Sequence, residues 1–169
     1  MMIKFSLKKH RLAGVCAGGM ETVRIVSPLI NIHGARLILG MTAIQFRWNL
    51  PRGCFPYIWD FGLKSPNDPN ENILTNGYQG VRFLTRSLLA IQRDDASLMP
   101  KSWEEAEELI VPKRPIMQNE LCVLLDCEES FLIKLKRHGL KVKHMGRSAR
   151  CEIAPGIVRD FLKLRRVNL

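Results

Sequence analysis

Three polar side chains recur on one face of a predicted helix in the last third of the chain. Ser130, Lys134 and Arg137 stand at positions i, i+4 and i+7, which share a face of an α-helix. Leu132 and Leu135 fall on the opposite face, where they would pack against the protein. Hydroxyl, ammonium and guanidinium groups donate hydrogen bonds to base edges and phosphate oxygens. The spacing predicts a helix that contacts nucleic acid; the alternative is a charged face that only solubilises the surface.

A second basic cluster follows this helix directly. Two short extended pieces, 141–144 and 150–153, are joined at Gly146–Ser148, which predicts a β-hairpin. The cations of the hairpin and of the preceding helix end are Lys136, Lys141, Lys143, Arg147 and Arg150. Arg147 lies at the expected tip of the hairpin, so it is the first candidate for contact with the minor groove or the backbone.

The elements that would position these side chains are bounded by local signals. Apolar residues at helical spacing from Leu121 to Leu125 predict one helix before the basic one. The interruption at Asp126–Glu128 predicts a tight turn between the two helices. Gly139 is expected to end the second helix in a left-handed conformation, and Pro155 suits the first turn of a third.

This order of helix, turn, helix, basic hairpin and helix resembles the winged helix-turn-helix of the excisionase and MerR-type DNA-binding families. The resemblance is carried by LLDCEESFLIKLKRHGL and KVKHMGRSARCEIA, followed by the third helix. Family members usually have a Leu–Gly pair before the turn and Ser or Thr opening the second helix, where this chain has Leu125–Asp126 and Glu128. A more distant similarity is to the helix-turn-helix regions of TniQ-type transposition proteins, whose zinc-binding cysteines this chain lacks.

The resemblance implies a DNA-binding protein of a bacterial or phage mobile element. Its second helix would enter the major groove of double-stranded DNA. The protein would act as an excisionase-like architectural factor in DNA recombination or as a transcriptional regulator. A recombinase, a transposase or another protein as a further partner, and a homo-oligomer on DNA, are left open.

The same order of elements is predicted once more, earlier in the chain. Leu39–Met41 aligns with Leu125–Cys127 at an offset of 86, whereas 81–84 aligns with 150–153 at an offset of 69. The difference between the two offsets means that the first wing would be longer than the second. The second helix of this earlier unit supplies four further candidates for DNA contact, Gln45, Arg47, Trp48 and Arg52.

Local signals bound the elements of this earlier unit. Thr42 is expected to cap its second helix, whose apolar residues are Ile44, Phe46 and Leu50. An extended strand is expected from Phe55 to Phe61, and Thr85 is expected to cap the third helix.

Trp48 allows two other interpretations. It is either packed in the core or exposed as part of a protein interface, because an exposed aromatic side chain is costly without a partner. With the acidic helix that begins after Ser102, the second interpretation gives the alternative function of a protein-binding adaptor. The similarity to TniQ-type proteins implies a further alternative, an accessory protein for transposon target selection.

Composition and charge agree with a polyanionic partner. The chain has 169 residues, a net charge of +10 and a pI near 9.7. Residues 130–169 carry 11 Lys and Arg against 2 acids, a balance of +9. The basic surplus therefore coincides with the second predicted helix and the hairpin.

The expected fold is mainly α-helical with small β-hairpin wings, as two tandem winged helix-turn-helix modules. The segments are an N-terminal arm (1–27), a first module with a long wing (28–95), an acidic helix and linker (96–115) and a second module (116–169). Ser102 is expected to cap the acidic helix, which would end near Ile110. This helix is expected to present a solvated face; the alternatives are that it shields the basic module or docks a partner.

Other classes of protein lack support in the sequence. The four histidines are scattered and no phosphate-binding glycine loop occurs, so we expect no enzyme, cofactor or metal site. The five cysteines have no zinc-type spacing and are expected to be free thiols in a reducing cytoplasm. No apolar run approaches the ~18 residues of a membrane span, so no membrane partner is expected.

Overall fold

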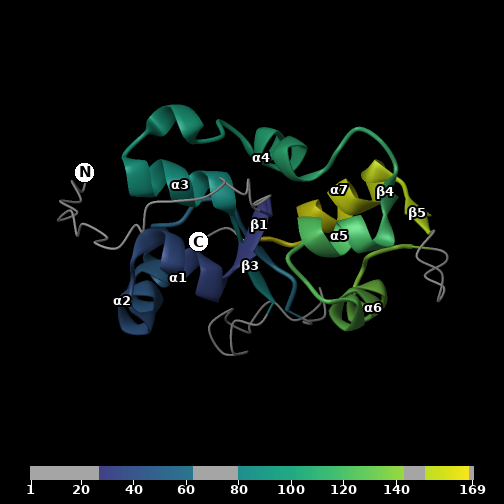
Figure 1. The fold of residues 1–169 in the computed structure, drawn as a ribbon, viewed down its shortest axis with the longest axis horizontal. Helices are drawn as coiled ribbons and strands as arrows, with labels where there is room; N and C mark the ends of the chain where they lie inside the picture. The colour runs from purple at the N-terminus through teal and green to yellow at the C-terminus, as the bar shows by residue number, and fades with distance from the viewer. Residues whose placement is uncertain (1–26, 63–79, 143–150, 168–169) are drawn as a thin grey trace, which may run out of the picture.

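Short α-helices and two small antiparallel sheets make up the computed structural model of the chain (Figure 1). The structure describes residues 27–62, 80–142 and 151–167. The helices are α1 (Ile32–Leu39), α2 (Ala43–Asn49), α3 (Thr85–Arg93), α4 (Trp103–Ile110), α5 (Gln118–Leu124), α6 (Glu129–Arg137) and α7 (Pro155–Leu164). The strands are β1 (Leu29–Asn31), β2 (Ile58–Asp60), β3 (Val81–Leu84), β4 (Ile116–Met117), β5 (Glu152–Ile153) and β6 (Arg166–Val167), and the 3-10 turns are η1 (Leu50–Arg52) and η3 (Ala96–Leu98). The described residues are thus mainly helical with small antiparallel sheets, as predicted.

Four strands form the larger sheet, in the order β1-β3-β2-β6. Strand β3 lies between β1 and β2 and pairs antiparallel with both, so Phe83 stands opposite Ile30 on one side and Ile58 on the other. Strand β6 follows the last helix and pairs antiparallel with β2, with Val167 opposite Ile58. The end of the described chain therefore completes a sheet that begins at Leu29. The smaller sheet is the β4–β5 pair.

Five elements of the first half of the chain (β1 to α3) recur in the same order in the second half (β4 to β6), whereas η1 and β2 have no described counterpart there. Strand β1, α1, α2, β3 and α3 are matched by β4, α5, α6, β5 and α7. The turn between the first two helices repeats its hydrogen bonds, and Gly40 and Asp126 both adopt a left-handed conformation, with φ of 63° and 48°. The repeated N–O pairs are Gly40–Leu37 (3.3 Å) and Asp126–Val123 (3.2 Å), then Met41–Arg36 (3.0 Å) and Cys127–Cys122 (2.9 Å). This geometry agrees with the alignment predicted for the two turns.

The later strand and helix align one position away from the prediction. Strand partners at the equivalent place are Asn31–Arg82 in β1–β3 and Met117–Glu152 in β4–β5, so Arg82 matches Glu152 and not Cys151. The third helices begin at Thr85 and Pro155, which keeps the same alignment. The segment between the second helix and the returning strand is therefore longer in the first half, as predicted. The difference in length between the two segments is one residue smaller than predicted.

Thr85 is not the N-cap of its helix, contrary to the prediction. The N-cap is Leu84, which makes no side-chain capping bond, and Thr85 is the first helical residue. The Thr85 hydroxyl instead donates to the carbonyl oxygen of Ser27 at 2.6 Å. By contrast, Thr42 caps α2 and Ser102 caps α4, as expected from the sequence.

The predicted strands are shorter in the structure. The extended segment expected from Phe55 to Phe61 narrows to β2, because Tyr57 has a left-handed φ of 58° that interrupts an extended chain. Of the hairpin expected over 141–153, residues 141–142 are outside any strand and 143–150 lie outside the described residues. Its remaining strand, β5, pairs with β4.

Two clusters of apolar side chains form the core. One lies within the first half, where the ring of Phe46 stacks on Phe55 at 4.6 Å and meets the edge of Phe83 at 5.2 Å. The other is shared by both halves, and in it the rings of Phe61 and Phe161 lie 5.4 Å apart. The halves are therefore held together by a common core as well as by β6.

Candidate nucleic-acid interface

The basic face of α6 is exposed and its apolar face is buried. Leu132 and Leu135 are fully buried in the shared core. Ser130, Lys134 and Arg137 are exposed, as the helical spacing predicts. The structure therefore brings these three predicted contact residues together on one accessible side of a single helix.

Hydrogen bonds hold both ends of α6. The amide Nε2 of Gln118, the first residue of α5, donates to Glu129 Oε1 at 2.6 Å in the first turn of α6. At the other end, Gly139 has a φ of 112° and the Leu140 amide donates to the Leu135 carbonyl oxygen at 3.0 Å. Gly139 thus ends the helix as predicted, and α6 is fixed along its length.

The other predicted contacts of this half are only partly described. Lys136 is half-buried and Lys141 is exposed. Lys136 shares the last turn of α6 with Lys134 and Arg137, where cations interact favourably with the helix dipole. Lys143, Arg147 and Arg150 lie outside the described residues.

The second helix of the first half presents a different set of groups. Arg47, Trp48 and Arg52 are exposed, and the Arg52 guanidinium lies 5.8 Å from the centre of the Trp48 ring. Gln45 is exposed, but its Oε1 accepts from the Thr42 amide at 2.9 Å in a capping box. The core interpretation of Trp48 is therefore wrong, since 63% of its surface is exposed.

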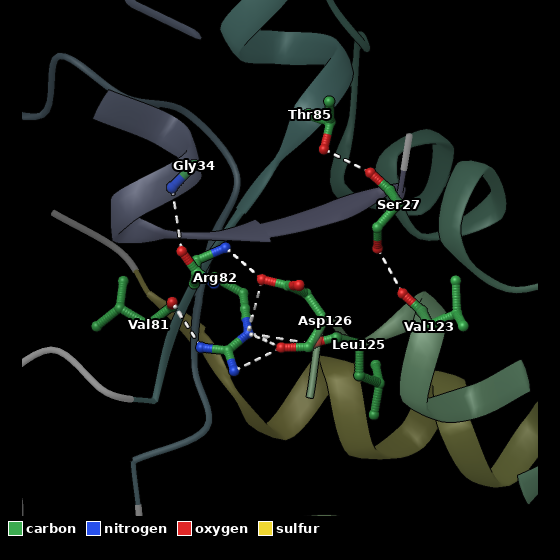
Figure 2. Close-up of polar contacts among 9 residues, drawn as sticks. Ser27, Gly34, Val81, Arg82, Thr85, Val123, Leu125 and Asp126 are labelled. Carbon is green, nitrogen blue, oxygen red and sulfur yellow. Dashed lines mark hydrogen bonds and ion pairs between the residues drawn. The ribbon is translucent and has the colours of Figure 1, made fainter. Parts of the chain in front are cut away.

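A buried arginine joins the two halves, and the sequence analysis did not single it out. Arg82 on β3 is only 5% exposed, and its guanidinium reaches the C-terminal end of α5 (Figure 2). Its Nε donates to Leu125 O at 3.0 Å and its Nη2 to Asp126 O at 2.8 Å, while Nη1 donates to Val81 O at 3.0 Å. The carbonyl groups of Leu125 and Asp126 follow the last turn of α5. Carbonyl groups at a helix C-terminus carry partial negative charge and lack partners within the helix, so a cation beside them is favourable.

The Asp126 carboxylate makes the return contact. Its Oδ2 accepts a hydrogen bond from the backbone N–H of Asn31 at 2.7 Å and lies 4.0 Å from Arg82 Nε. Asn31 also caps α1, since its Oδ1 accepts from the Gly34 amide at 3.1 Å (Figure 2). Beside this contact, the Ser27 hydroxyl donates to Val123 O. The turn between α5 and α6 is thereby anchored on β1 and the start of α1.

Burial lowers the pKa of Arg82, and the negative charge of Asp126 acts in the opposite direction. The guanidinium also lies over the rings of Phe61 and Phe131, at 5.9 and 5.7 Å. A charged residue in an otherwise apolar strand, Val81-Arg82-Phe83-Leu84, was the sequence signal for this contact, because a buried charge needs a partner. The partner itself could not be found from local spacing.

A second polar contact ties α4 to β6. Arg166 Nε donates to Glu107 Oε1 at 2.8 Å, and its Nη2 lies 3.3 Å from Glu104 Oε1. The hydrogen bond that Arg166 donates to Glu107 is the main cause of the raised pKa of Arg166. The acidic helix, for which a solvated face was expected, therefore buries Glu107 and uses it to hold the returning strand.

Comparison with known proteins finds no matching family model, no matching curated protein and no matching solved structure.

Within the described residues, no group of three or more His, Cys, Asp or Glu could hold a metal ion. No helix of the described chain is long and apolar enough to span a membrane. Cys54, Cys122, Cys127 and Cys151 are free thiols, as predicted, and Cys16 lies outside the described residues.

Proposed function

We propose that the protein binds double-stranded DNA, with α6 as the helix that enters the major groove. The observation that carries this proposal is the exposed face of Ser130, Lys134 and Arg137 on a helix whose opposite face is buried. The surrounding sequence, 130–169, has a surplus of nine positive charges. Charge of this density favours phosphate contact, and the three donors on one face can reach base edges.

Roles within the interface follow from position. Ser130 lies in the first turn of α6, and Lys134 lies one helical turn later on the same exposed face, at the start of the last turn. Both would face base edges in the major groove. Lys136 and Arg137 lie in the last turn and Lys141 just beyond it, where contact with phosphates fits better. Lys143, Arg147 and Arg150 would extend phosphate or minor-groove contact through the wing.

The anchoring of α6 supports this assignment. Arg82 and Asp126 fix the turn before α6 on the sheet of the first half, and Gln118 fixes the first turn of α6. A helix already held in one orientation loses less conformational entropy when it binds. As in excisionase-like and MerR-like proteins, the DNA-bound state would serve recombination of a mobile element or regulation of transcription.

The experiment uses the full chain and a pool of random duplexes. Bound duplexes are selected through several rounds, and binding of the enriched site and of random DNA is measured by fluorescence anisotropy over a salt series. We expect log K to fall linearly with log salt, by about 0.9 for each phosphate contact. Lys134→Ala should weaken the enriched site by about 1–3 kcal/mol while random DNA is less affected.

The matched control is Lys163→Ala, which removes an exposed lysine from α7 instead of α6. It should leave the preference for the enriched site unchanged. The proposal fails if the folded full chain does not bind duplex DNA at low salt. The assignment of Lys134 to base contact fails if both variants lose the same affinity on both kinds of DNA.

A further inference from the structure

The second helices of the two halves present different chemistry at equivalent positions. In the alignment set by the repeated turn, Ile44 of α2 corresponds to Ser130 of α6, and Trp48 corresponds to Lys134. Two polar residues of the proposed DNA-binding face are therefore replaced by a branched apolar residue and an aromatic one. A face built for the same ligand would keep donors at these places.

The apolar pair on α2 is exposed. Ile44 is 68% and Trp48 63% exposed, and their i, i+4 spacing places them side by side on the helix. Of the three apolar residues predicted for this helix, Ile44, Phe46 and Leu50, only Phe46 and Leu50 are buried. Helix α6 also exposes one apolar residue, Ile133, but without an aromatic neighbour on that face.

Charge around this pair limits what could cover it. Residues 29–53, which hold α1 and α2, contain Arg36, Arg47 and Arg52 and no Asp or Glu. A second copy of the same face would bring like charges together, which disfavours a self-complementary dimer. A partner with carboxylates around apolar side chains would complement both the arginines and the apolar pair.

The composition of the face also argues against DNA as its ligand. Trp and Arg are the residues most enriched among the energetic centres of protein interfaces. The Oε1 of Gln45 is already engaged in the capping box, so it is not free to accept a hydrogen bond from a base. The Arg52 guanidinium lies 5.8 Å from the centre of the Trp48 ring, so a cation and an aromatic side chain are adjacent on this face.

We propose that the exposed face of α2, formed by Ile44 and Trp48 and bordered by Arg47 and Arg52, docks an acidic amphipathic segment of another protein. The apolar side chains of that segment cover Ile44 and Trp48, and its carboxylates pair with the arginines. The two halves then divide the work, since α6 contacts DNA and α2 recruits a protein. This proposal does not require DNA binding by α6.

The test uses the full chain and three dye-labelled synthetic helical peptides of equal length. One carries Leu and Phe on one face with Glu elsewhere, the second has Lys in place of every Glu, and the third has Gln in place of every Glu. Anisotropy should show saturable binding of the Glu peptide, and the Lys peptide should not bind. Tryptophan emission should shift to the blue with the Glu peptide, because Trp48 is the most exposed of the three tryptophans.

The decisive variants copy α6 onto α2. Ile44→Ser and Trp48→Lys should each weaken the Glu peptide, Trp48→Lys by about thirtyfold, the effect expected of an aromatic anchor. Leu164→Ser, which alters an exposed leucine of α7, should bind as the wild type does. Circular dichroism of each variant checks that the fold is kept, as expected for exposed positions.

Three outcomes would overturn the proposal. The first is no saturable binding of the Glu peptide up to millimolar concentration. The second is equal binding of the Glu and Gln peptides, which removes charge complementarity. The third is loss of duplex DNA affinity in the double variant of Ile44→Ser and Trp48→Lys, which would assign α2 to DNA. If that double variant keeps DNA affinity and loses the Glu peptide, the division of work is supported.

Discussion

Gly40 and Asp126 occupy equivalent left-handed positions between the first two helices of each half, yet they contribute differently. Glycine adopts this conformation without steric cost, and aspartate is one of the few other residues that tolerate it. The Asp126 carboxylate accepts from the Asn31 amide, which a glycine could not do. An aspartate at this left-handed position, in place of a glycine as at Gly40, therefore has a structural reason in this chain.

Arg82 should be among the most sensitive positions for stability. Arg82→Met keeps much of the buried volume but leaves the carbonyl groups of Leu125 and Asp126 without their donor. We expect the free energy of unfolding to fall by about 3 kcal/mol, measured by urea denaturation. Arg93→Met, at the exposed end of α3, is the control and should change it by less than about 0.5 kcal/mol. A loss below about 1 kcal/mol at Arg82 would contradict the role given to it.

The thiol of Cys127 should lower the free energy of unfolding at alkaline pH. Burial, with a smaller contribution from Cys122, raises its pKa from 9.0 to about 12. Below pH 9 the thiol is protonated in both states; above it, only the unfolded state loses the proton. Stability should therefore fall as the pH rises from 9 to about 12. In Cys127→Ala the free energy of unfolding should fall less over that window, and equal slopes for the two proteins would refute the assignment.

At the scale of elements, substitution of Gly40 and Gly156 tests the left-handed turn between α1 and α2. A Cβ at Gly40 or at Gly156 would meet no atom within 4 Å, but Gly40 has a φ of 63° and Gly156 lies within α7. Gly40→Ala should therefore destabilise the protein by about 1–2 kcal/mol through backbone strain alone. Gly156→Ala should stabilise it by about 0.4–1 kcal/mol. Thermal unfolding of both variants gives the comparison, and the same sign for both would contradict the left-handed turn.

Elements with local signals were predicted well from the sequence. The caps Thr42 and Ser102 and the glycine end of α6 need only a few neighbouring residues to be recognised. The alignment of the returning strands was predicted one position off, because Val81–Leu84 pairs with a strand far away in the sequence, Leu29–Asn31. Pairing of that kind depends on tertiary structure and leaves little trace in a short apolar run.

The sequence also predicted only part of the candidate site. The face of Ser130, Lys134 and Arg137 follows from helical spacing alone, and the structure exposes it. Ile44 was grouped with core residues because periodicity does not say which apolar positions have a neighbour to pack on. Arg82 was missed because its partners, Leu125 and Asp126, lie 43 and 44 positions further along the chain.

At the scale of the whole molecule, the two halves pack against each other through a shared core. In Figure 1 the β1–β3 pair lies between α1 and α2 at one end and α5, α6 and α7 at the other. Leu29, Trp59 and Leu84 from the first half share a buried cluster with Leu121 and Phe161 from the second. Because this cluster and the Arg82 contacts cross between the halves, neither half can complete its own packing alone.

A prediction about fragments follows from this shared core. A fragment of residues 115–169 should show no cooperative thermal transition by circular dichroism, because it lacks the partners of Phe161 and of β6. The full chain should unfold in a single transition seen alike by far-ultraviolet dichroism and by tryptophan emission. Independent folding of the fragment, or two separate transitions in the full chain, would show that the halves are energetically separate.

The pairing of β6 with β2 also affects how the chain folds during its synthesis. Val167 stands opposite Ile58, so most of the chain is synthesised between the two partners. At about 5–20 residues per second, this interval lasts on the order of ten seconds on the ribosome. Throughout it one edge of β2 has no strand beside it from this sheet, and open edges invite pairing with other chains. The growing polypeptide is therefore most exposed to misassembly before Arg166 and Val167 leave the ribosome, and slower translation would lengthen that exposure.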